Sequence, residues 1–399
     1  MNYDIIVVGG GPAGLSFAQS LTDTNLKVLV IEKAKLIQLQ KPQPDGREIA
    51  LTHKSVRILK KLKVWDKFNK NDISPIKKAE VLSGEEPALL EFDSKAAGVD
   101  ALGYLIPNYI IRKTIFNVVK TKKNITINPN FRVEHVFADN NEAYVILDDG
   151  NKISASLIVA ADSRFSTLRK KMGIAATVRE FSKTMIVCRV EHEKPHNSIA
   201  KECFFYGRTM AILPLNGNIS SILITVETNK ADELLSLNDK ELNSEIQKYF
   251  NEFLGNTKIV SNRYSYPLSG VHADKFIKPK FALIGDASVG MHPVTAHGFN
   301  LGLSGQNILA KNIKKALANN EDIGSLTVLK DYERRHMLET KIMYLGTNSV
   351  VSLFTNDAPI LKQLRKLTLK FANNFPPLKY VITEQLTESK KISKFLPWM

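Results

Sequence analysis

The sequence predicts an α/β fold in which a Rossmann-like dinucleotide-binding domain is interleaved with a mostly antiparallel β-sheet domain and followed by a helical region. Three observations predict this fold. An apolar strand runs into a glycine-rich turn and a helix over residues 3–21, a similar strand ends on an acid over 157–173, and short strand-like runs fill 183–227. Strands that alternate with helices favour a parallel sheet, whereas successive short strands favour an antiparallel one.

The first of these segments carries a GxGxxG pattern. Residues 3–8 form an apolar run that leads into Gly9, Gly11 and Gly14 at the start of a helix. In this context the first glycine permits a tight turn, the second lets the backbone approach a pyrophosphate, and the third lets the helix pack on the strand. We therefore expect dinucleotide binding.

A second strand, residues 27–33, ends near Glu32, which lies 18 residues beyond Gly14. A carboxylate at this point accepts hydrogen bonds from the adenosine ribose hydroxyls and repels a 2′-phosphate. The tightly held nucleotide is therefore expected to be FAD or NAD rather than NADP.

Residues 281–305 repeat the order of strand, acid and helix. The apolar run 281–284 ends at Gly285 and Asp286, and a helix is expected to begin at about 298–300. The aspartate is placed to bind polyol hydroxyls, and the helix N-terminus favours an anion. A flavin dinucleotide needs both. The alternative is that Asp286 caps a turn and the glycines serve packing.

Two arginines are further candidates for cofactor contact. Within residues 46–68, the apolar positions Ile49, Leu51, Val56, Leu59 and Leu62 indicate a helical element with Arg47 just ahead of it. Arg112 follows Asn108 at a strand-to-helix junction. An arginine in such a place binds a phosphate or a flavin edge, or lies on the surface. The sequence leaves both interpretations open.

Asp162 ends the apolar strand that begins at residue 157 and is a second acidic candidate for cofactor contact. Arg164 and Arg169 follow it, and they either assist or are solvated. The strands of 183–227 are expected to form the wall of a substrate cavity. Its candidate lining residues, for each of which core packing is the alternative, are Phe204, Phe205, Tyr206, Met210 and Leu213.

Composition narrows the classes of protein. The chain has 399 residues, 44% of them hydrophobic and 24% charged, and its net charge is +15. This excess suits an anionic surface or ligand, although a solvated basic surface explains it equally well. Without a recognisable nucleic-acid-binding signature, nucleic acid is not an expected partner. No zinc-ligand spacing occurs, so no metal centre is expected.

The two cysteines, Cys188 and Cys203, do not form a disulfide framework, which favours a reducing cytoplasm. Neither a signal peptide nor a membrane span is expected. Near the C-terminus, apolar positions from Ile360 to Phe371 alternate with lysines and Arg365 at helical spacing. Such a basic amphipathic helix either lies on anionic lipid or packs on its own domain.

Taken together, these segments resemble the class A FAD-dependent aromatic hydroxylases, and more closely the ubiquinone-biosynthesis hydroxylase family, which includes the 5-demethoxyubiquinol 5-hydroxylases. The likeness covers nearly the whole chain. It rests on the segments GREIALTHKSVRIL, PHNSIAKECFFYGRTMAILPL, HPVTAHGFNLGL and LRKLTLKFANNFPPLK.

The resemblance implies a site for FAD. Pro293, His297 and Gly298 would form the environment of the flavin ring, with no obligatory acid or base among the side chains. The cofactor-binding residues would be Gly9, Gly11, Pro12, Ala13, Gly14, Glu32, Lys33, Arg47, Arg112, Asp162, Gly285, Asp286, Pro293, Gly298, Phe299 and Asn300.

Two departures from the family pattern concern this site. The chain has Asp162-Ser163 where the family commonly has Asp-Gly, which puts the use of NADPH in doubt. It also has Ala296-His297-Gly298 in place of Gly-Gln-Gly. His297 either titrates near the flavin or has a structural role.

The resemblance also implies a mechanism and a setting. Reduced FAD would capture O2 as a C4a-hydroperoxide, whose distal oxygen is attacked by the ring of a polyprenyl phenol or quinol. NAD(P)H is the candidate transient reductant. The enzyme would be cytoplasmic, with peripheral attachment to the inner face of the cell membrane and contact with other ubiquinone-biosynthesis proteins as open questions.

The expected division into domains is discontinuous. The FAD-binding domain comprises 1–76, 104–180 and 270–330, the substrate domain 77–103 and 181–269, and the helical region 331–399.

Other readings remain open from the sequence. They are a hydroxylase of small aromatic molecules, a polyprenyl reductase and a low-turnover FAD-binding assembly subunit. A flavin halogenase is disfavoured, because Trp65 and Trp398 do not form its paired-tryptophan motif.

Overall fold

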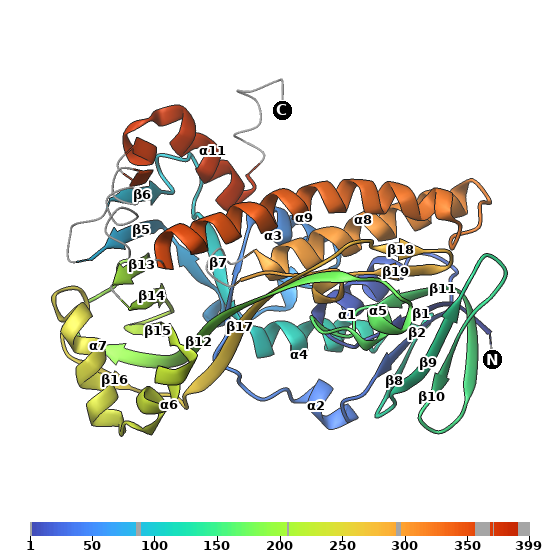
Figure 1. The fold of residues 1–399 in the computed structure, drawn as a ribbon, viewed down its shortest axis with the longest axis horizontal. Helices are drawn as coiled ribbons and strands as arrows, with labels where there is room; N and C mark the ends of the chain where they lie inside the picture. The colour runs from blue at the N-terminus through green and yellow to red at the C-terminus, as the bar shows by residue number, and fades with distance from the viewer. Residues whose placement is uncertain are drawn as a thin grey trace.

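The computed structural model describes residues 2–84, 89–205, 207–292, 297–355, 368–369 and 371–389. Two large sheets lie toward opposite ends of the molecule, and long helices run along one side (Figure 1). The mixed α/β class expected from the sequence is confirmed.

The first sheet has the amino-terminal strand near its centre. Because a central parallel strand is covered on both faces, it needs continuous apolar residues, and Ile5, Ile6 and Val7 are fully buried. The described strands, in spatial order, are β18 (Ile277–Lys278), β19 (Phe281–Leu283), β11 (Lys152–Ala160), β1 (Asn2–Val8), β2 (Val28–Glu32) and β8 (Ile125–Pro129), with β10 (Ala143–Leu147) and β9 (Val133–Ala138) extending from β11.

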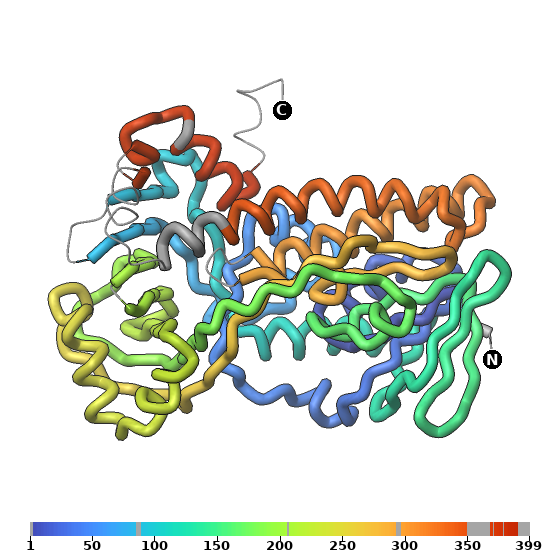
Figure 2. Tube along the Cα trace, in the orientation of Figure 1, coloured from blue at the N-terminus to red at the C-terminus, as the bar shows by residue number. Residues whose placement is uncertain are grey.

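Segments that are distant in the sequence lie side by side in this sheet (Figure 2). β1 pairs in parallel with β2 and β11, and β11 pairs in parallel with β19. The carboxyl ends of β1, β11 and β19 therefore meet at one edge, where α1 (Pro12–Ser20) and α8 (Gly298–Ala318) begin and pack together.

The second sheet is mostly antiparallel, with one parallel pair between β13 and β5. One face packs on α6 (Thr228–Ser236) and α7 (Asp239–Leu254) through buried residues such as Ile186 and Ile224. Its strands, in spatial order, are β20 (Val289–Gly290), β17 (Tyr264–Ala273), β12 (Ala176–His192), β15 (Ile219–Glu227), β14 (Arg208–Pro214), β13 (Ile199–Phe205), β5 (Lys78–Ser83) and β6 (Leu90–Asp93), and β16 (Thr257–Ile259) pairs with β12.

A small third sheet corrects one expectation. The helical element was expected to include Ile49 and Leu51, but β3 (Glu48–Leu51) pairs with β7 (Gly103–Pro107), which also pairs with β4 (Ser74–Ile76). The helix α3 (His53–Lys61) begins only after Thr52, whose side chain accepts a hydrogen bond from the Ser55 N–H. Tertiary pairing with β7 thus decides the conformation of residues 48–51.

The remaining helices connect or cover these sheets. α8 lies against α9 (Leu326–Thr355), and α4 (Asn108–Val119) packs on α1. The shorter elements are α2 (Leu36–Gln40), η1 (Trp65–Lys67), η2 (Lys70–Asp72), α5 (Thr167–Lys171) and η3 (Gly285–Ala287), and α11 (Pro376–Thr387) lies near the C-terminal end.

The structure describes only part of the C-terminal segment for which a basic amphipathic helix was expected. The apolar positions Ile360, Leu361, Leu364 and Leu367 lie outside the described residues, whereas the Phe371 side chain is exposed. Among the helices that the structure describes, none has both the length and the apolar character needed to cross a bilayer.

Candidate active site

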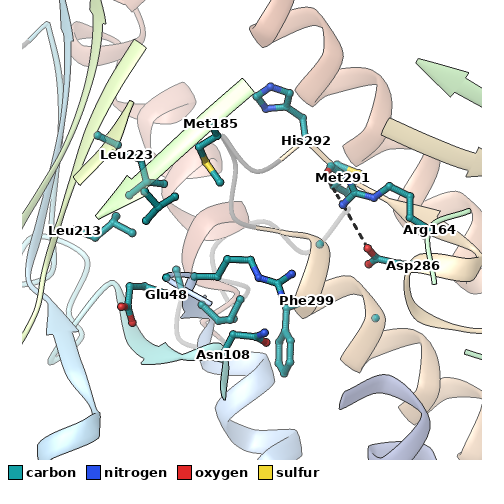
Figure 3. A pocket seen from close by; sticks show the side chains of 18 of the residues that line it. Glu48, Asn108, Arg164, Met185, Leu213, Leu223, Asp286, Met291, His292 and Phe299 are labelled. Carbon is teal, nitrogen blue, oxygen red and sulfur yellow. Dashed lines mark hydrogen bonds and ion pairs between the residues drawn. The ribbon is translucent and has the colours of Figure 1, made fainter. Parts of the chain in front are cut away.

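A cavity of about 550 Å³ lies between the carboxyl edge of the first sheet and the free face of the second. On one side Arg164 reaches toward Asp286, and on the other Met185, Leu213 and Leu223 project from the second sheet (Figure 3). The expected site residues that line this cavity are Gly11, Pro12, Ala13, Arg47, Arg112, Gly285, Asp286, Gly298 and Phe299.

The glycine turn leaves open space where a cofactor would lie. A Cβ atom on Gly9 would be 2.3 Å from the Ala161 carbonyl oxygen, and one on Gly14 would be 2.0 Å from the Gly9 oxygen. These two glycines are therefore required by the protein's own packing. A Cβ on Gly11 would meet no described atom within 4 Å, and no side chain caps α1. The open N-terminus of α1 suits a pyrophosphate.

Glu32 lies beside this turn but does not line the cavity. Its Oε2 accepts a hydrogen bond from the Gly10 N–H over 2.6 Å, and its Oε1 accepts one from the Ala34 N–H over 2.8 Å. The carboxylate is thus fixed next to the glycine turn, as a ribose-binding acid requires. Lys33, the next residue, also lies outside the cavity lining.

Arg47 and Asn108 enter the cavity from different elements and share one carboxylate. Arg47 Nη2 and Asn108 Nδ2 lie 2.6 and 2.7 Å from the same oxygen of Asp45. The guanidinium carbon of Arg47 also lies 5.4 Å from the centre of the Tyr266 ring. Asp45 and Tyr266 therefore hold Arg47 at the rim of the cavity, while Arg112 reaches the cavity from α4.

Asp162 and Arg164 are two positions apart in the chain, but only Arg164 lines the cavity. Asp162 is not among the cavity-lining residues, because its carboxylate accepts hydrogen bonds from the Ser166 hydroxyl and the Thr167 N–H at the start of α5. Ser163 has a φ of 149°, a region in which glycine is favoured. Arg164 instead reaches the cavity, with Nη2 3.3 Å from the Asp286 carboxylate and Nη1 2.6 Å from the Ser269 carbonyl oxygen.

Sequence reasoning left the roles of Arg164 and Arg169 open. Arg169 is buried, and its guanidinium donates to the carbonyl oxygens of Ala287 and Arg164. It therefore stabilises the segments that carry Arg164 and Ala287 without lining the cavity itself. Gly290 leaves room for Arg164, since a Cβ at that position would lie 2.5 Å from Arg164 Nε. That contact depends on the fold and is invisible in the chain itself.

The turn after β19 is confirmed as a strand-to-turn segment leading toward a helix. Gly285 has a φ of 59°, and a Cβ there would lie 2.7 Å from the Ala13 Cβ. Asp286 lines the cavity and pairs with Arg164. α8 begins at Gly298, with His297 as its N-cap residue and no capping side chain. The N-termini of α1 and α8 and the carboxylate of Asp286 therefore border the same cavity.

His297 and Asn300 are buried beside the cavity rather than in its lining. Asn300 accepts a hydrogen bond from the Thr52 N–H over 3.2 Å and donates one to the Ala50 carbonyl oxygen over 2.8 Å. His297 Nε2 lies 3.4 Å from the Gln385 carbonyl oxygen. Both residues thus join α8 to neighbouring elements. Pro293 and residues 294–296 lie outside the described residues.

The second sheet provides an apolar wall. Because side chains alternate between the two faces of a strand, Phe204 and Leu213 line the cavity, whereas Phe205 and Met210 pack on the opposite side against α6 and α7. The expectation was thus wrong for the latter two, and Tyr206 lies outside the described residues. The other wall residues of the second sheet include Phe181, Lys183, Met185, Val187, Glu202, Thr209, Ala211, Leu223 and Thr225.

His292 was not among the expected site residues, although it lines the cavity and is buried. Its ring meets Phe181 edge-on, with 4.6 Å between the ring centres. Burial lowers the pKa of His292 to about 4, and the positive charges of Arg164 and Arg179 act in the same direction. The imidazole is therefore neutral at physiological pH.

These features define a dinucleotide-dependent oxidoreductase: a glycine turn and two open helix N-termini face an apolar chamber. The fit to FAD rests on the open space at Gly11, the carboxylate of Asp286 and the arginines at the rim. The chain belongs to the FAD-binding domain family, whose model matches residues 2–341.

The curated relatives extend over nearly the whole chain. It is 46% identical to the ubiquinone hydroxylase UbiM of Neisseria meningitidis, over 97% of this chain and 85% of the relative. It is 31% identical to the ubiquinone hydroxylase UbiL of Rhodospirillum rubrum, over 94% and 87%, and 28% identical to the 3-demethoxyubiquinol 3-hydroxylase of Escherichia coli, over 94% and 96%. The resemblance inferred from the sequence is confirmed.

Solved structures agree on the fold. The p-nitrophenol 4-monooxygenase PnpA of Pseudomonas putida superposes with a TM-score of 0.78 at 17% identity, covering 97% of this chain and 98% of that one. The protein is an FAD-dependent monooxygenase with the expected class A flavin hydroxylase fold. When bound, FAD supplies the redox chemistry that activates O2, with NAD(P)H as the reductant typical of the family.

Proposed function

We propose that this enzyme hydroxylates the aromatic ring of a polyprenyl phenol or quinol in ubiquinone biosynthesis, with 5-demethoxyubiquinol as the first candidate substrate. The observation that carries the proposal is the cavity, in which the flavin-binding edge faces a mostly apolar wall. The names of the relatives at 46% and 31% identity, both ubiquinone hydroxylases, support the same substrate class.

In this proposal the chain has three tasks. The glycine turn, Glu32 and Asp286 bind FAD, and Arg47, Arg112 and the N-terminus of α8 favour negative charge on the reduced ring. Met185, Leu213 and Leu223 exclude water from the reacting ring. The discontinuous division into an FAD-binding domain, a substrate domain and a helical region is part of the same proposal, as are the roles of Pro293 and His297 beside the flavin.

We also propose that the enzyme works at the cytoplasmic face of the membrane, where a polyprenyl substrate resides. Leu338, Ile342 and Leu345 of α9 have exposed fractions of 65%, 63% and 57%. Their spacing places them on one side of the helix, and the exposed Arg334 and Lys341 flank them. We call the three apolar residues the α9 stripe. An apolar stripe with basic neighbours suits an anionic lipid surface.

The decisive experiment is quinone profiling by mass spectrometry in a strain that lacks this gene. We expect the accumulation of a polyprenyl quinol that lacks one ring oxygen, and the structure of that intermediate identifies the ring position. A plasmid carrying the wild-type gene is expected to restore the quinone. A normal quinone profile in the deletion strain would overturn the proposal.

A second measurement separates the enzyme from a low-turnover assembly subunit. Purified FAD-loaded protein is given a reductant, a prenylated phenol and isotopically labelled dioxygen. Incorporation of one labelled oxygen atom into the ring supports the hydroxylase. Protein that binds FAD but never yields labelled product supports the assembly subunit, and turnover only with a short, unprenylated phenol supports a hydroxylase of small aromatics.

A further inference from the structure

Glu202 is an acid in the otherwise mostly apolar wall of the cavity. It lies on β13, opposite Ala211 of β14 and Val81 of β5. Ala211 and the next residue on the same face, Phe204, also line the cavity. By the alternation of a strand, Lys201 and Cys203 project to the other face. The carboxyl group is therefore surrounded by apolar neighbours on its own side of the sheet.

The charged groups on adjoining elements have partners of their own. Lys201 lies 2.5 Å from Glu80, which also binds Lys78 on β5. The remaining pairs on the elements around this wall are Arg208 with Glu245, Lys183 with Glu227, Glu48 with Arg189, Arg47 with Asp45, Arg164 with Asp286, and Lys379 with Asn373. Within the described part of the chain, Glu202 itself has no hydrogen bond or ion pair.

Burial has a direct effect on this carboxyl group. It raises the pKa of Glu202 to about 8, and no neighbouring charge opposes the effect. The Glu202 side chain is itself only partly buried, but a ligand that fills the cavity covers it, and a covered acceptor without a partner is unfavourable. A ligand that supplies a donor hydroxyl at this point therefore gains affinity. A phenol is such a donor, because its own pKa is about 10 and it stays neutral below that pH.

We propose that Glu202 accepts a hydrogen bond from the ring hydroxyl of the aromatic substrate and makes the cavity selective for a free phenol over its methyl ether. This inference deepens the proposed function and rests on it. A methyl ether has no proton to donate and leaves the ionised carboxylate without a partner, which is the arrangement by which binding sites reject analogues most strongly. The hydrogen bond also orients the ring with respect to the flavin edge of the cavity.

The test measures binding and needs no turnover. Oxidised, FAD-loaded protein is titrated with an alkylated phenol and with its methyl ether, from about pH 6 to about pH 9, a range in which the free phenol remains neutral. Flavin fluorescence reports binding. For the wild type we expect phenol affinity to rise as the pH passes through about 8, where Glu202 ionises. Ether affinity should fall over the same range, because a protonated Glu202 can donate to the ether oxygen and an ionised one cannot.

Glu202→Gln removes the charge and keeps the shape. We expect it to lose the pH dependence and to bind the phenol about 10- to 100-fold more weakly at high pH, the range for a hydrogen bond to a charged group. The matched control is Glu91→Gln on β6 of the same sheet, outside the cavity lining and with 41% of its side chain exposed. It should keep the wild-type profile.

Retention of the wild-type preference and pH dependence by Glu202→Gln would overturn the inference, as would a wild type that binds phenol and ether alike. If Glu202→Gln does not fold, Glu202→Asp replaces it. The shorter acid should keep the pH dependence with weaker phenol binding, and loss of that dependence would contradict the proposal. A further outcome is a normal quinone profile in the deletion strain while phenol binding still depends on Glu202. That result would reject the role in ubiquinone biosynthesis and leave the role of Glu202 in place.

Discussion

Thr52 and Glu388 are 336 positions apart in the chain, yet the Thr52 hydroxyl donates a hydrogen bond to the Glu388 carboxylate over 2.6 Å. Lys54 Nζ lies 3.2 Å from the same carboxylate, and Arg57 donates to the Glu388 carbonyl oxygen over 2.9 Å. The backbone N–H of Thr52 meanwhile binds Asn300 at the start of α8. The residue that follows α11 is thus attached to the segment that positions the candidate flavin helix.

Glu388→Gln is expected to weaken this attachment. Loss of the charge removes the ion pair with Lys54 and leaves weaker hydrogen bonds, so we expect the free energy of unfolding to fall by about 1 kcal/mol. FAD affinity should fall with it, since α8 loses part of its support. Urea denaturation and flavin fluorescence measure the two effects. Gln385→Ala, at an exposed position of α11, is the control, and equal behaviour of both variants would refute the coupling.

Gly11 and Gly14 are expected to respond differently to alanine. A methyl group on Gly11 meets no described atom, whereas one on Gly14 would overlap the Gly9 oxygen. Gly11→Ala should therefore leave the unfolding free energy of the FAD-free protein within about 0.5 kcal/mol of the wild type and lower FAD affinity by about 10-fold or more. Gly14→Ala should destabilise even the FAD-free protein, by about 2 kcal/mol or more.

Calorimetric titration with FAD and thermal unfolding of the FAD-free proteins distinguish these two variants. Normal FAD affinity in Gly11→Ala would show that the pyrophosphate does not approach this turn. A stable, FAD-free Gly14→Ala protein would contradict the packing role of that glycine.

Glu339 provides a prediction for the dependence of stability on pH. Burial acts to raise the pKa of Glu339, but His336 and Lys54 outweigh it and hold that pKa at about 2, below its ordinary value of 4.5. A carboxyl whose folded pKa is lowered stabilises the fold above the unfolded pKa, and this contribution is lost as the pH falls toward the folded pKa. The stabilisation by Glu339 should be complete above about pH 4.5 and decline toward pH 2.

Urea denaturation of the wild type and Glu339→Gln tests this sign. Their difference in unfolding free energy should be constant at neutral pH and shrink below about pH 4.5. Glu252→Gln, at an exposed position of α7, should show no such trend. A difference that grows as the pH falls would mean that the ion pair with Lys54 is absent in solution.

The α9 stripe predicts lipid binding. Replacement of Leu338, Ile342 and Leu345 by serine removes about 1.5 kcal/mol or more of apolar transfer per residue if the stripe enters the bilayer. We expect binding to anionic vesicles in a flotation assay to fall at least about 10-fold, with FAD content unchanged. Leu36 and Ile37 on α2 are also exposed, and their replacement by serine is the control. Unchanged flotation of the α9 variant would dismiss this surface.

Local patterns were sufficient for the parts of the site that are continuous in the chain. The strand, glycine turn and helix at β1 and α1, and the strand and acid that precede α8, were correctly predicted, because each signal lies within a few residues. The wall of the cavity was only partly predicted. The sequence alone does not distinguish Phe204 from Phe205, because both are phenylalanines in the same strand. The pairing of β13 with β14 and β5 decides which of them faces the cavity.

The residues whose place in the site could not be predicted from the sequence share one physical explanation. Arg164 reaches the cavity and Arg169 supports it from behind because of where Asp286, Met291 and Ala287 lie, more than 100 positions further along the chain. Distant contacts also explain why the cavity is lined by His292, Phe181 and Glu48, which the sequence did not single out. β3 was mistaken for helix because its partner β7 is distant in sequence. Contacts of this kind are absent from local spacing.

The arrangement of the first sheet has a consequence for biosynthesis. β1 is synthesised first, yet its neighbour β11 is completed only at residue 160, β19 at residue 283, and α8, whose Gln306 accepts a hydrogen bond from Ser20 of α1, later still. On the ribosome, the first three-quarters of the nascent chain therefore lack the second half of the nucleotide pocket. With FAD bound as we propose, flavin uptake is expected to follow the emergence of α8, because a chain interrupted before that point lacks part of the proposed binding site.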